Sequence, residues 1–265
     1  MNDQKLHMLI YIMLIVILGG AAWYIWSDIR PVTLQPAPVR PRPVVEETPA
    51  PREPIHPIEP MATSEASSEL VPLPALDESD SYFLLALADA FGADVGRLLV
   101  DEALIDKFVA TLDNLDRGHV SEKIRPVGTL SGEFIADGAD SKGPYYLSSD
   151  NYERYESLVS LVASADLEVV TAMYRRFYPL FQKSYERLGY PNAYFNDRVV
   201  EIIDHLLETP EAETPTRLVR PHVLYEFEDS GVESLSSGQK LLIRMGSEHA
   251  AYIKRALRGL RSRIT

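Results

Sequence analysis

The sequence predicts a mainly α-helical domain that is held behind a membrane-spanning helix and a proline-rich linker. Three observations predict this: an uncharged N-terminal run, a concentration of proline after it, and helical spacing of apolar residues beyond. We divide the 265 residues into an anchor over 1–30, a disordered linker over 31–75 and a compact helical domain over 76–265. Within that domain we expect at most a small two-stranded β element.

The predicted anchor is the run Met8–Trp26, which holds 19 residues without a charged side chain. As a helix, this run is long enough to cross a bilayer core of about 30 Å. A cleaved signal peptide is the alternative, because Gly19–Ala22 are small enough to form a cleavage site. The apolar run continues past them to Trp26, which favours an uncleaved single span.

Two observations about the orientation of the span oppose each other. Lys5 precedes it, whereas three arginines follow it by position 42, and the positive-inside rule taken alone favours a cytoplasmic domain. Long domains cross a membrane largely regardless of charge, however, and a proline-rich linker is suited to reach outward. We expect the C-terminal domain outside the cytoplasm, against the arginine count.

The linker, Pro31–Ala75, carries 12 of the 19 prolines. Proline fixes φ and lacks an N–H donor, so this segment cannot join the interior of a helix or sheet. An extended spacer is the preferred interpretation. A docking site for an SH3- or WW-like partner is the alternative, but PxxP motifs arise easily where proline is this dense.

Apolar residues at helical spacing predict the helices of the domain. One helix begins near Asp80 and ends at Gly92, with Phe83, Leu87 and Phe91 on one face. Pro179 is expected to kink or restart a second helix, and Ser236 with Gln239 forms a capping box. The other predicted helices are 102–115, 148–165, 167–188, 196–208 and 236–264, the last broken near 246, with short strands at 132–136 and 223–227.

Composition excludes several classes of function. Acidic residues outnumber basic ones by 39 to 26, for a net charge of -13, which argues against a nucleic-acid-binding protein. The absence of cysteine excludes disulfides, thiolate nucleophiles and cysteine-ligated metals. No P-loop, GxGxxG, HExxH or GxSxG motif occurs. We therefore assign no catalytic residue, metal or cofactor and favour a non-catalytic protein.

The helix predicted at 196–208 is the best-defined candidate for a binding surface. Its polar residues fall within an arc of about 120°, and Asp197, Glu201 and His205 recur at i, i+4 and i+8. Such a stripe could hold a divalent metal or serve acid–base chemistry on a glycan. The alternative is a solvated acidic face that Asn196 caps. The predicted binding residues are Tyr190, Phe195, Asn196, Asp197, Arg198, Glu201, Asp204, His205, Arg220 and Arg244.

The last 26 residues are basic, in contrast to the acidic domain before them. They carry seven Lys or Arg residues against one Glu, with an apolar seam that includes Ile253, Leu257 and Ile264. This pattern predicts a basic amphipathic helix. Binding of anionic lipid or another polyanion, and docking on the acidic body of the same domain, both account for it.

Several segments of the domain resemble a bacterial family of single-span envelope proteins known as domain of unknown function 3014. The resemblance implies the same layout of span, linker and domain, but no activity, ligand or catalytic residue. The segments are Leu73–Asp80 (LPALDESD), Phe108–Gly118 (FVATLDNLDRG), Leu188–Pro210 (LGYPNAYFNDRVVEIIDHLLETP), Leu218–Asp229 (LVRPHVLYEFED) and Ser236–Arg258 (SSGQKLLIRMGSEHAAYIKRALR).

From the layout and the resemblance together, we expect a single-pass protein of a bacterial inner membrane with a periplasmic domain. The expected function is that of a membrane-anchored, non-catalytic interaction module, with an envelope protein or peptidoglycan as its partner. The alternative is an enzyme that acts on cell-wall glycan through carboxylates of the 196–208 helix.

Overall fold

The computed structural model describes residues 53–58, 72–128, 132–138 and 144–265, all within one compact unit, Pro49–Thr265. The predicted anchor and most of the predicted linker lie outside these residues. Among the described helices, none is long and apolar enough to cross a membrane alone. Helices α4 (Asp150–Ser164) and α5 (Leu167–Arg187) meet that criterion only as a pair, and they are bent by 88° at their junction.

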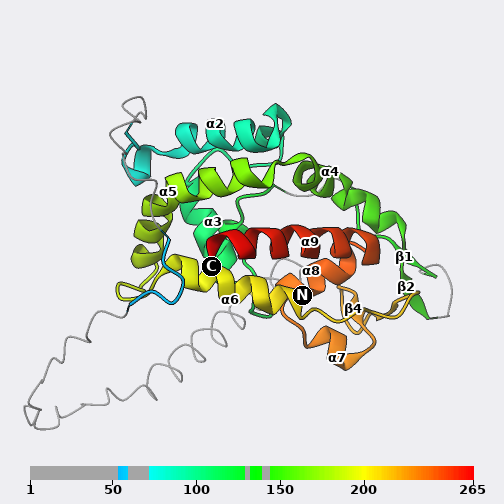
Figure 1. Cartoon of the computed structure of the whole chain (residues 1–265). Coiled ribbons are helices and arrows are strands. Elements are labelled where there is room, and N and C mark those ends of the chain that lie inside the picture. Colours follow the sequence, from blue (N-terminus) through cyan, green and yellow to red (C-terminus); the bar gives the residue numbers. More distant parts are fainter. Residues whose placement is uncertain (1–52, 59–71, 129–131, 139–143) are drawn as a thin grey trace, which may run out of the picture. The chain divides into compact units, whose positions relative to one another are not determined.

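Eight α-helices account for most of the described chain, which confirms the mainly helical fold class (Figure 1). Short 3-10 helices, η1 (Leu76–Glu78), η2 (Ala93–Arg97) and η3 (Glu122–Ile124), join some of them. Besides α4 and α5, the α-helices are α2 (Asp80–Phe91), α3 (Leu104–Asp113), α6 (Phe195–Leu207), α7 (Ser230–Glu233), α8 (Ser237–Arg244) and α9 (Ser247–Ile264).

Glycines and one carboxylate set several helix ends. Gly92 ends α2 at φ 91°, and Gly246 separates α8 from α9 at φ 86°, a backbone region that glycine enters at little cost. The Asp80 carboxylate accepts the N–H groups of Ala103 and Leu104, each at 2.8 Å, so it caps α3 from the start of another helix. Helix α5 continues through Pro179 instead of restarting there.

The main core lies where α2, α3, α5 and α6 meet. Phe177, Phe181 and Phe195 are almost completely buried, and the Phe83 ring lies 5.1 Å from that of Phe177 and 5.6 Å from that of Phe181. Such clustering of aromatic rings supplies large buried apolar area in a small volume.

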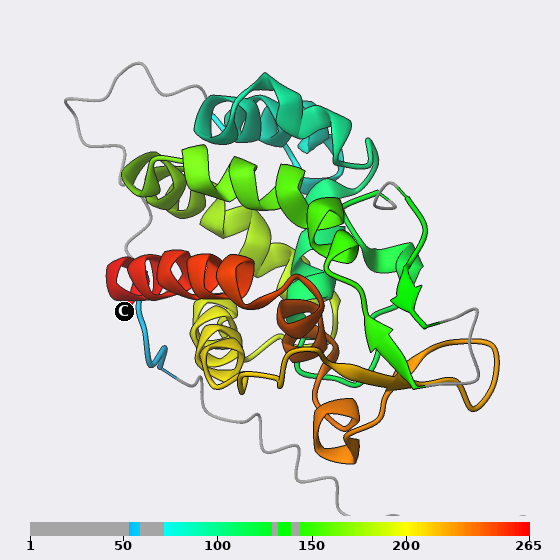
Figure 2. The same cartoon turned by 90° about the vertical axis from the view of Figure 1, so that its right-hand side faces the viewer.

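Helix α9 is docked on its own domain, between α5 and α6 (Figures 1 and 2). Ile264 is 3% exposed, and Leu257 and Leu260 pack against the main core. Of the two interpretations of the basic C-terminal segment, the structure shows the intramolecular one, because the apolar seam of the helix is already covered.

A small antiparallel sheet lies at one end of the domain (Figure 2). Its strands pair in sequence order: β1 (Ala136–Asp137), β2 (Tyr145–Leu147), β3 (Arg217–Val219) and β4 (Glu226–Phe227). The expectation of at most two strands was therefore wrong. Each strand has only two or three residues, too few to show the alternating pattern by which strands are recognised.

Candidate functional site

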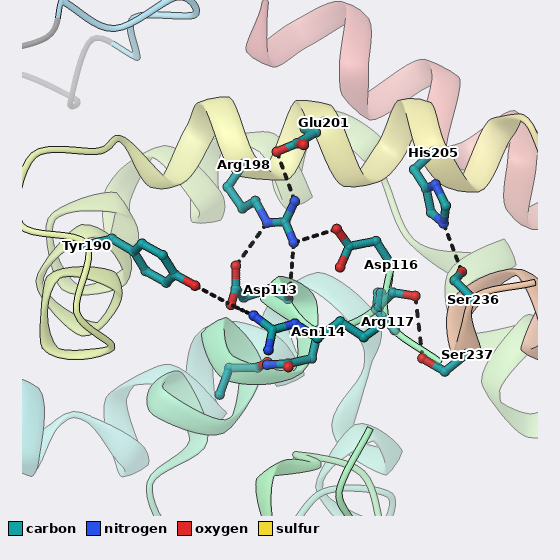
Figure 3. A network of polar contacts seen from close by, with 12 residues as sticks. Asp113, Asn114, Asp116, Arg117, Tyr190, Arg198, Glu201, His205, Ser236 and Ser237 are labelled. Atoms are coloured by element: carbon teal, nitrogen blue, oxygen red, sulfur yellow. Dashed lines mark hydrogen bonds and ion pairs between the residues drawn. The ribbon is translucent and has the colours of Figure 1, made fainter. Parts of the chain in front are cut away.

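The polar residues of α6 do not converge on one site. Asp197, Arg198, Glu201, Asp204 and His205 face different parts of the chain, and each makes a contact within the domain. Three separate connections result: one to the linker and the C-terminus, one to the end of α3 and the start of α8, and one to α9. The second of these is shown in Figure 3.

Arg198 is the centre of the connection to α3. Its guanidinium donates to the Asp113 carboxylate at 2.9 Å, the Asp113 carbonyl at 2.6 Å and the Asp116 carboxylate at 2.8 Å. It also donates to Glu201 at 2.9 Å, one turn along α6 (Figure 3). The Asp113 side chain is only 6% exposed and that of Arg198 13%, so this is a largely buried charge cluster.

Burial by itself would lower the pKa of Arg198, but hydrogen bonds to Glu201, Asp116 and Asp113 outweigh it and raise the pKa above its ordinary value. Tyr190 donates to the same Asp113 carboxylate at 3.3 Å. Burial above all, and then the charge of Asp113, raise the pKa of the neighbouring Tyr185 to about 12. Arg198 therefore stays charged and Tyr185 stays neutral across neutral pH.

His205 connects α6 to the beginning of α8. Its Nε2 lies 2.8 Å from the Ser236 hydroxyl, and that hydroxyl also accepts the Gln239 N–H at 3.2 Å. The capping box of Ser236 and Gln239 is confirmed, and the Gln239 amide donates to the His205 carbonyl. Ser236 is only 6% exposed, and its hydroxyl is engaged as the N-cap of α8.

Asp204 connects α6 to α9 through a bidentate ion pair. Its two oxygens accept from Arg261 at 2.5 and 2.8 Å. The hydrogen bond from Arg261, which outweighs the opposing effect of burial, lowers the pKa of Asp204. One cation of the basic helix α9 thus forms an ion pair with a carboxylate of α6.

The N-terminal end of α6 holds a segment of the linker. The Asp197 carboxylate accepts the N–H groups of Ile55 at 3.0 Å and His56 at 2.7 Å. The Asn196 amide donates to the His56 carbonyl at 2.9 Å and to the Ile264 carbonyl at 2.7 Å. We call residues 53–58 the docked linker segment. It lies beside the C-terminal end of α9 in Figure 2.

Asn196 does not cap α6, which corrects that expectation. The N-cap is Tyr194, without a side-chain cap bond, and the Asn196 amide is fully buried. Its side-chain oxygen accepts a hydrogen bond from the Tyr174 hydroxyl at 3.0 Å, and its side-chain nitrogen donates to the carbonyls of His56 and Ile264. Each polar atom of this amide therefore has a partner, as burial requires.

The other predicted residues lie in different places. Phe195 is fully buried in the main core, and the Tyr190 ring stacks on Tyr185 at 4.6 Å. Arg220 is exposed with its guanidinium 5.2 Å from the Tyr225 ring, and Arg244 lies 5.5 Å from the Phe227 ring. The binding role of the set stays a prediction, but Phe195 and Asn196 have no solvent-facing surface through which to serve it.

Asp113 and Asp116 are the important polar residues that sequence reasoning missed. Both lie in the segment LDNLDR at the end of α3, where carboxylates three positions apart face Arg198. Their spacing was visible, but the partner is more than 80 positions away. Within the described residues, no group of three or more His, Asp or Glu side chains is arranged to hold a metal ion.

Comparison with known proteins agrees with the sequence resemblance. A search of curated proteins and a search of solved structures found no match. A family model described as a protein of unknown function, DUF3014, matches residues 104–261, from the start of α3 almost to the end of α9. This span includes Arg198, its partners on α3 and the whole sheet, and the chain therefore belongs to the DUF3014 family.

Proposed function

We propose that this chain is a membrane-anchored, non-catalytic interaction module that faces the bacterial cell envelope. The observation that carries the proposal is the docked linker segment, which joins the middle of the linker to the body of the domain through Asn196 and Asp197. A domain that is attached to its linker at a defined point is suited to presentation at a distance from a membrane. The anchor itself, Met8–Trp26, enters from its length and composition alone.

The surface best suited to a partner is the end of the domain that carries the sheet. Val223 and Leu224, in the loop between β3 and β4, are each 76% exposed, and Arg220 lies beside them in the same loop. Phe134, Ile135 and Val219 add partly exposed apolar surface. We call these five apolar residues the sheet patch. Exposed apolar side chains beside polar ones are typical of protein-binding surfaces.

Site-specific photo-crosslinking in living cells tests this proposal. A photoreactive residue at position 222 should yield a defined adduct with an envelope protein or with peptidoglycan. Leu224→Asp should abolish the adduct, because a charge disrupts an apolar contact. The matched control is Leu85→Asp on α2, which is 67% exposed and outside the sheet patch, and which should leave the adduct unchanged. An adduct that survives L224D, or none above background, contradicts the proposal.

Proteinase K applied to spheroplasts tests the orientation separately. A periplasmic domain should be degraded while a cytosolic marker stays intact. Protection of the domain would instead place it in the cytoplasm, and the envelope partner would then be excluded.

The contacts of α6 do not favour the alternative of a glycan-acting enzyme. A general acid needs a raised pKa at neutral pH, whereas the ion pair with Arg261 lowers the pKa of Asp204. Glu201, the other carboxylate considered, is 67% exposed and is paired with Arg198.

A further inference from the structure

A hollow of about 410 Å³ lies between α8, the beginning of α9 and the segment that leads from α6 to β3. This volume is within the range of sites that hold a small organic molecule. None of its residues belongs to the sheet patch, so it is a separate feature of the domain. Its walls include Tyr152, Thr209, Thr216, Leu242, Ser247 and Lys254.

Three cations of α9 line this hollow: Lys254, Arg255 and Arg258. Within the described part of the chain, no carboxylate oxygen lies within 4.0 Å of their nitrogens, in contrast to Arg198 and Arg261. Lys254 donates instead to the Thr209 carbonyl at 2.5 Å, and the Arg255 guanidinium lies 5.1 Å from the Tyr252 ring. The hollow therefore has an excess of positive charge in an otherwise acidic protein.

The electrostatics of Lys254 agree with this description. Burial and the nearby charge of Arg258 lower its pKa, and Glu211, an exposed wall residue, acts in the opposite direction. A cation destabilised by a like charge is stabilised again when an anion binds between the two.

Helix α9 adds backbone donors at one end of the hollow. Ser247, its first residue, is part of the wall, and the N-cap Gly246 supplies no side-chain acceptor for the N–H groups of the first turn. Such uncapped N–H groups favour oxygen acceptors, but they lie about 10–17 Å along the helix from Lys254 and Arg258 and so serve the other end of the hollow.

The remaining walls are apolar. Tyr152, Leu242 and Ile243 line the hollow beside the cations. The hollow thus has a cationic wall beside an apolar wall, which suits a ligand that has a charged group and a compact apolar body.

We propose that this hollow binds a small organic phosphate, with the phosphate between Lys254 and Arg258 and the apolar body against Tyr152 and Leu242. A phosphate monoester carries close to two negative charges at neutral pH, which suits a wall of three cations and one carboxylate, Glu211, better than a singly charged ligand does. The site extends beyond the proposed function, since partner binding at the sheet patch does not require it.

The test uses the full chain in neutral detergent micelles and follows the fluorine resonance of 4-fluorophenyl phosphate during a protein titration. We expect saturable binding that exceeds the binding of 4-fluorobenzoate, and none for the uncharged 4-fluorobenzyl alcohol beyond that of empty micelles. Arg258→Gln and Lys254→Gln should each weaken binding of the phosphate at least about tenfold, since each removes a charged hydrogen-bond donor from the site.

Arg263→Gln is the matched control, because it removes the same charge from the same helix at a position outside the hollow. It should leave the affinity unchanged. Within the described residues, Arg258 makes no hydrogen bond or ion pair on which the fold depends, so R258Q tests the site even if K254Q fails to fold. The proposal is overturned if the phosphate does not bind saturably, if R258Q binds as tightly as the wild type, or if the alcohol binds equally well.

Discussion

Arg198 holds together parts of the chain that are far apart in sequence. Its guanidinium donates to Asp113, Asp116 and Glu201, so a single side chain pairs with carboxylates from two helices and from the turn that follows α3. Arginine suits this position because its planar fork stays charged when it is partly buried. A residue first considered as part of a binding surface is therefore explained by the charges that it neutralises.

Arg198→Gln should destabilise the domain strongly. The substitution leaves the Asp113 carboxylate, only 6% exposed, without its main partner, and breaking a buried pair costs on the order of 3 kcal/mol. Urea unfolding followed by circular dichroism measures the loss. Arg97→Gln is the control, because the Arg97–Asp94 pair is more than 80% exposed on both sides and is expected to change the free energy by less than about 1 kcal/mol. Equal effects of the two variants would contradict this account.

Asp204 predicts a dependence of stability on pH. Its pKa is lowered in the folded state by Arg261, so its ion pair stabilises the fold above the ordinary carboxyl pKa of about 3.9. That contribution is lost as the pH falls through the lower folded-state pKa. The difference in Tm between wild type and Asp204→Asn should therefore be present at pH 7 and shrink below about pH 4. Arg261→Gln should give the same profile, and a difference that persists at low pH would exclude the ion pair as its cause.

Among the elements, α8 shows how a helix beginning is fixed by neighbours on two sides. Ser237 and Gly238 donate their N–H groups to the carbonyls of Arg117 and Leu115, at 2.7 and 2.9 Å. The capping box satisfies a further donor. The first turn of α8 thus lies directly against the backbone that follows α3.

Gly238→Ala should destabilise this contact. A Cβ there would lie 2.6 Å from Leu206 Cδ2 and 2.9 Å from the Leu115 carbonyl oxygen, and the backbone oxygen cannot move without breaking its hydrogen bond. We expect a loss of about 1–3 kcal/mol in the free energy of unfolding, as for other overpacked sites. Gly118→Ala is the control, because nothing lies within 4 Å of its added Cβ. A G238A variant as stable as G118A would show that α8 can move away.

Helices of this fold are predictable and its strands are predictable only in part, for a physical reason. Helix α6 repeats its apolar spacing over 13 residues, and glycines such as Gly92 and Gly246 mark the boundaries of α2, α8 and α9. The strands predicted at 132–136 and 223–227 overlap β1 and β4, but β2 and β3 were missed, and their positions depend on pairing with each other and with these strands. No local pattern carries that information.

The site was predictable only in part for a related reason. Amphipathic spacing correctly grouped the polar residues of α6 on one side of the helix. It could not indicate their partners, because Asp113 is 85 positions from Arg198 and His56 is 140 positions from Asn196. Asn196 resembled a helix cap in the sequence, but the burial of its amide between three segments overrides that local preference.

At the scale of the whole molecule, only some of the cations of the basic helix α9 form ion pairs with the acidic body of the domain. Arg261 pairs with Asp204, but Lys254, Arg255 and Arg258 face a hollow instead. The docked linker segment covers part of the main core. Its Ile58 packs against that core, to which the buried C-terminal residue Ile264 also belongs. The two ends of the described chain are thus joined through Asn196.

Asp197→Ala should release the docked linker segment without unfolding the domain. The Asp197 carboxylate is the acceptor for the N–H groups of both Ile55 and His56, and a hydrogen bond to a charged group contributes about 1.5–3 kcal/mol. Hydrogen exchange at these two amides should accelerate at least about tenfold in the variant, since that factor corresponds to about 1.4 kcal/mol. Amides of α5 should keep their protection, because the helical core does not depend on this contact. Glu201→Ala, which removes a carboxylate of the same helix that does not contact the docked linker segment, should leave both amides protected. Unchanged exchange at Ile55 and His56 in D197A would mean that Asp197 does not hold the linker, and the point of attachment on which the proposed function depends would be lost.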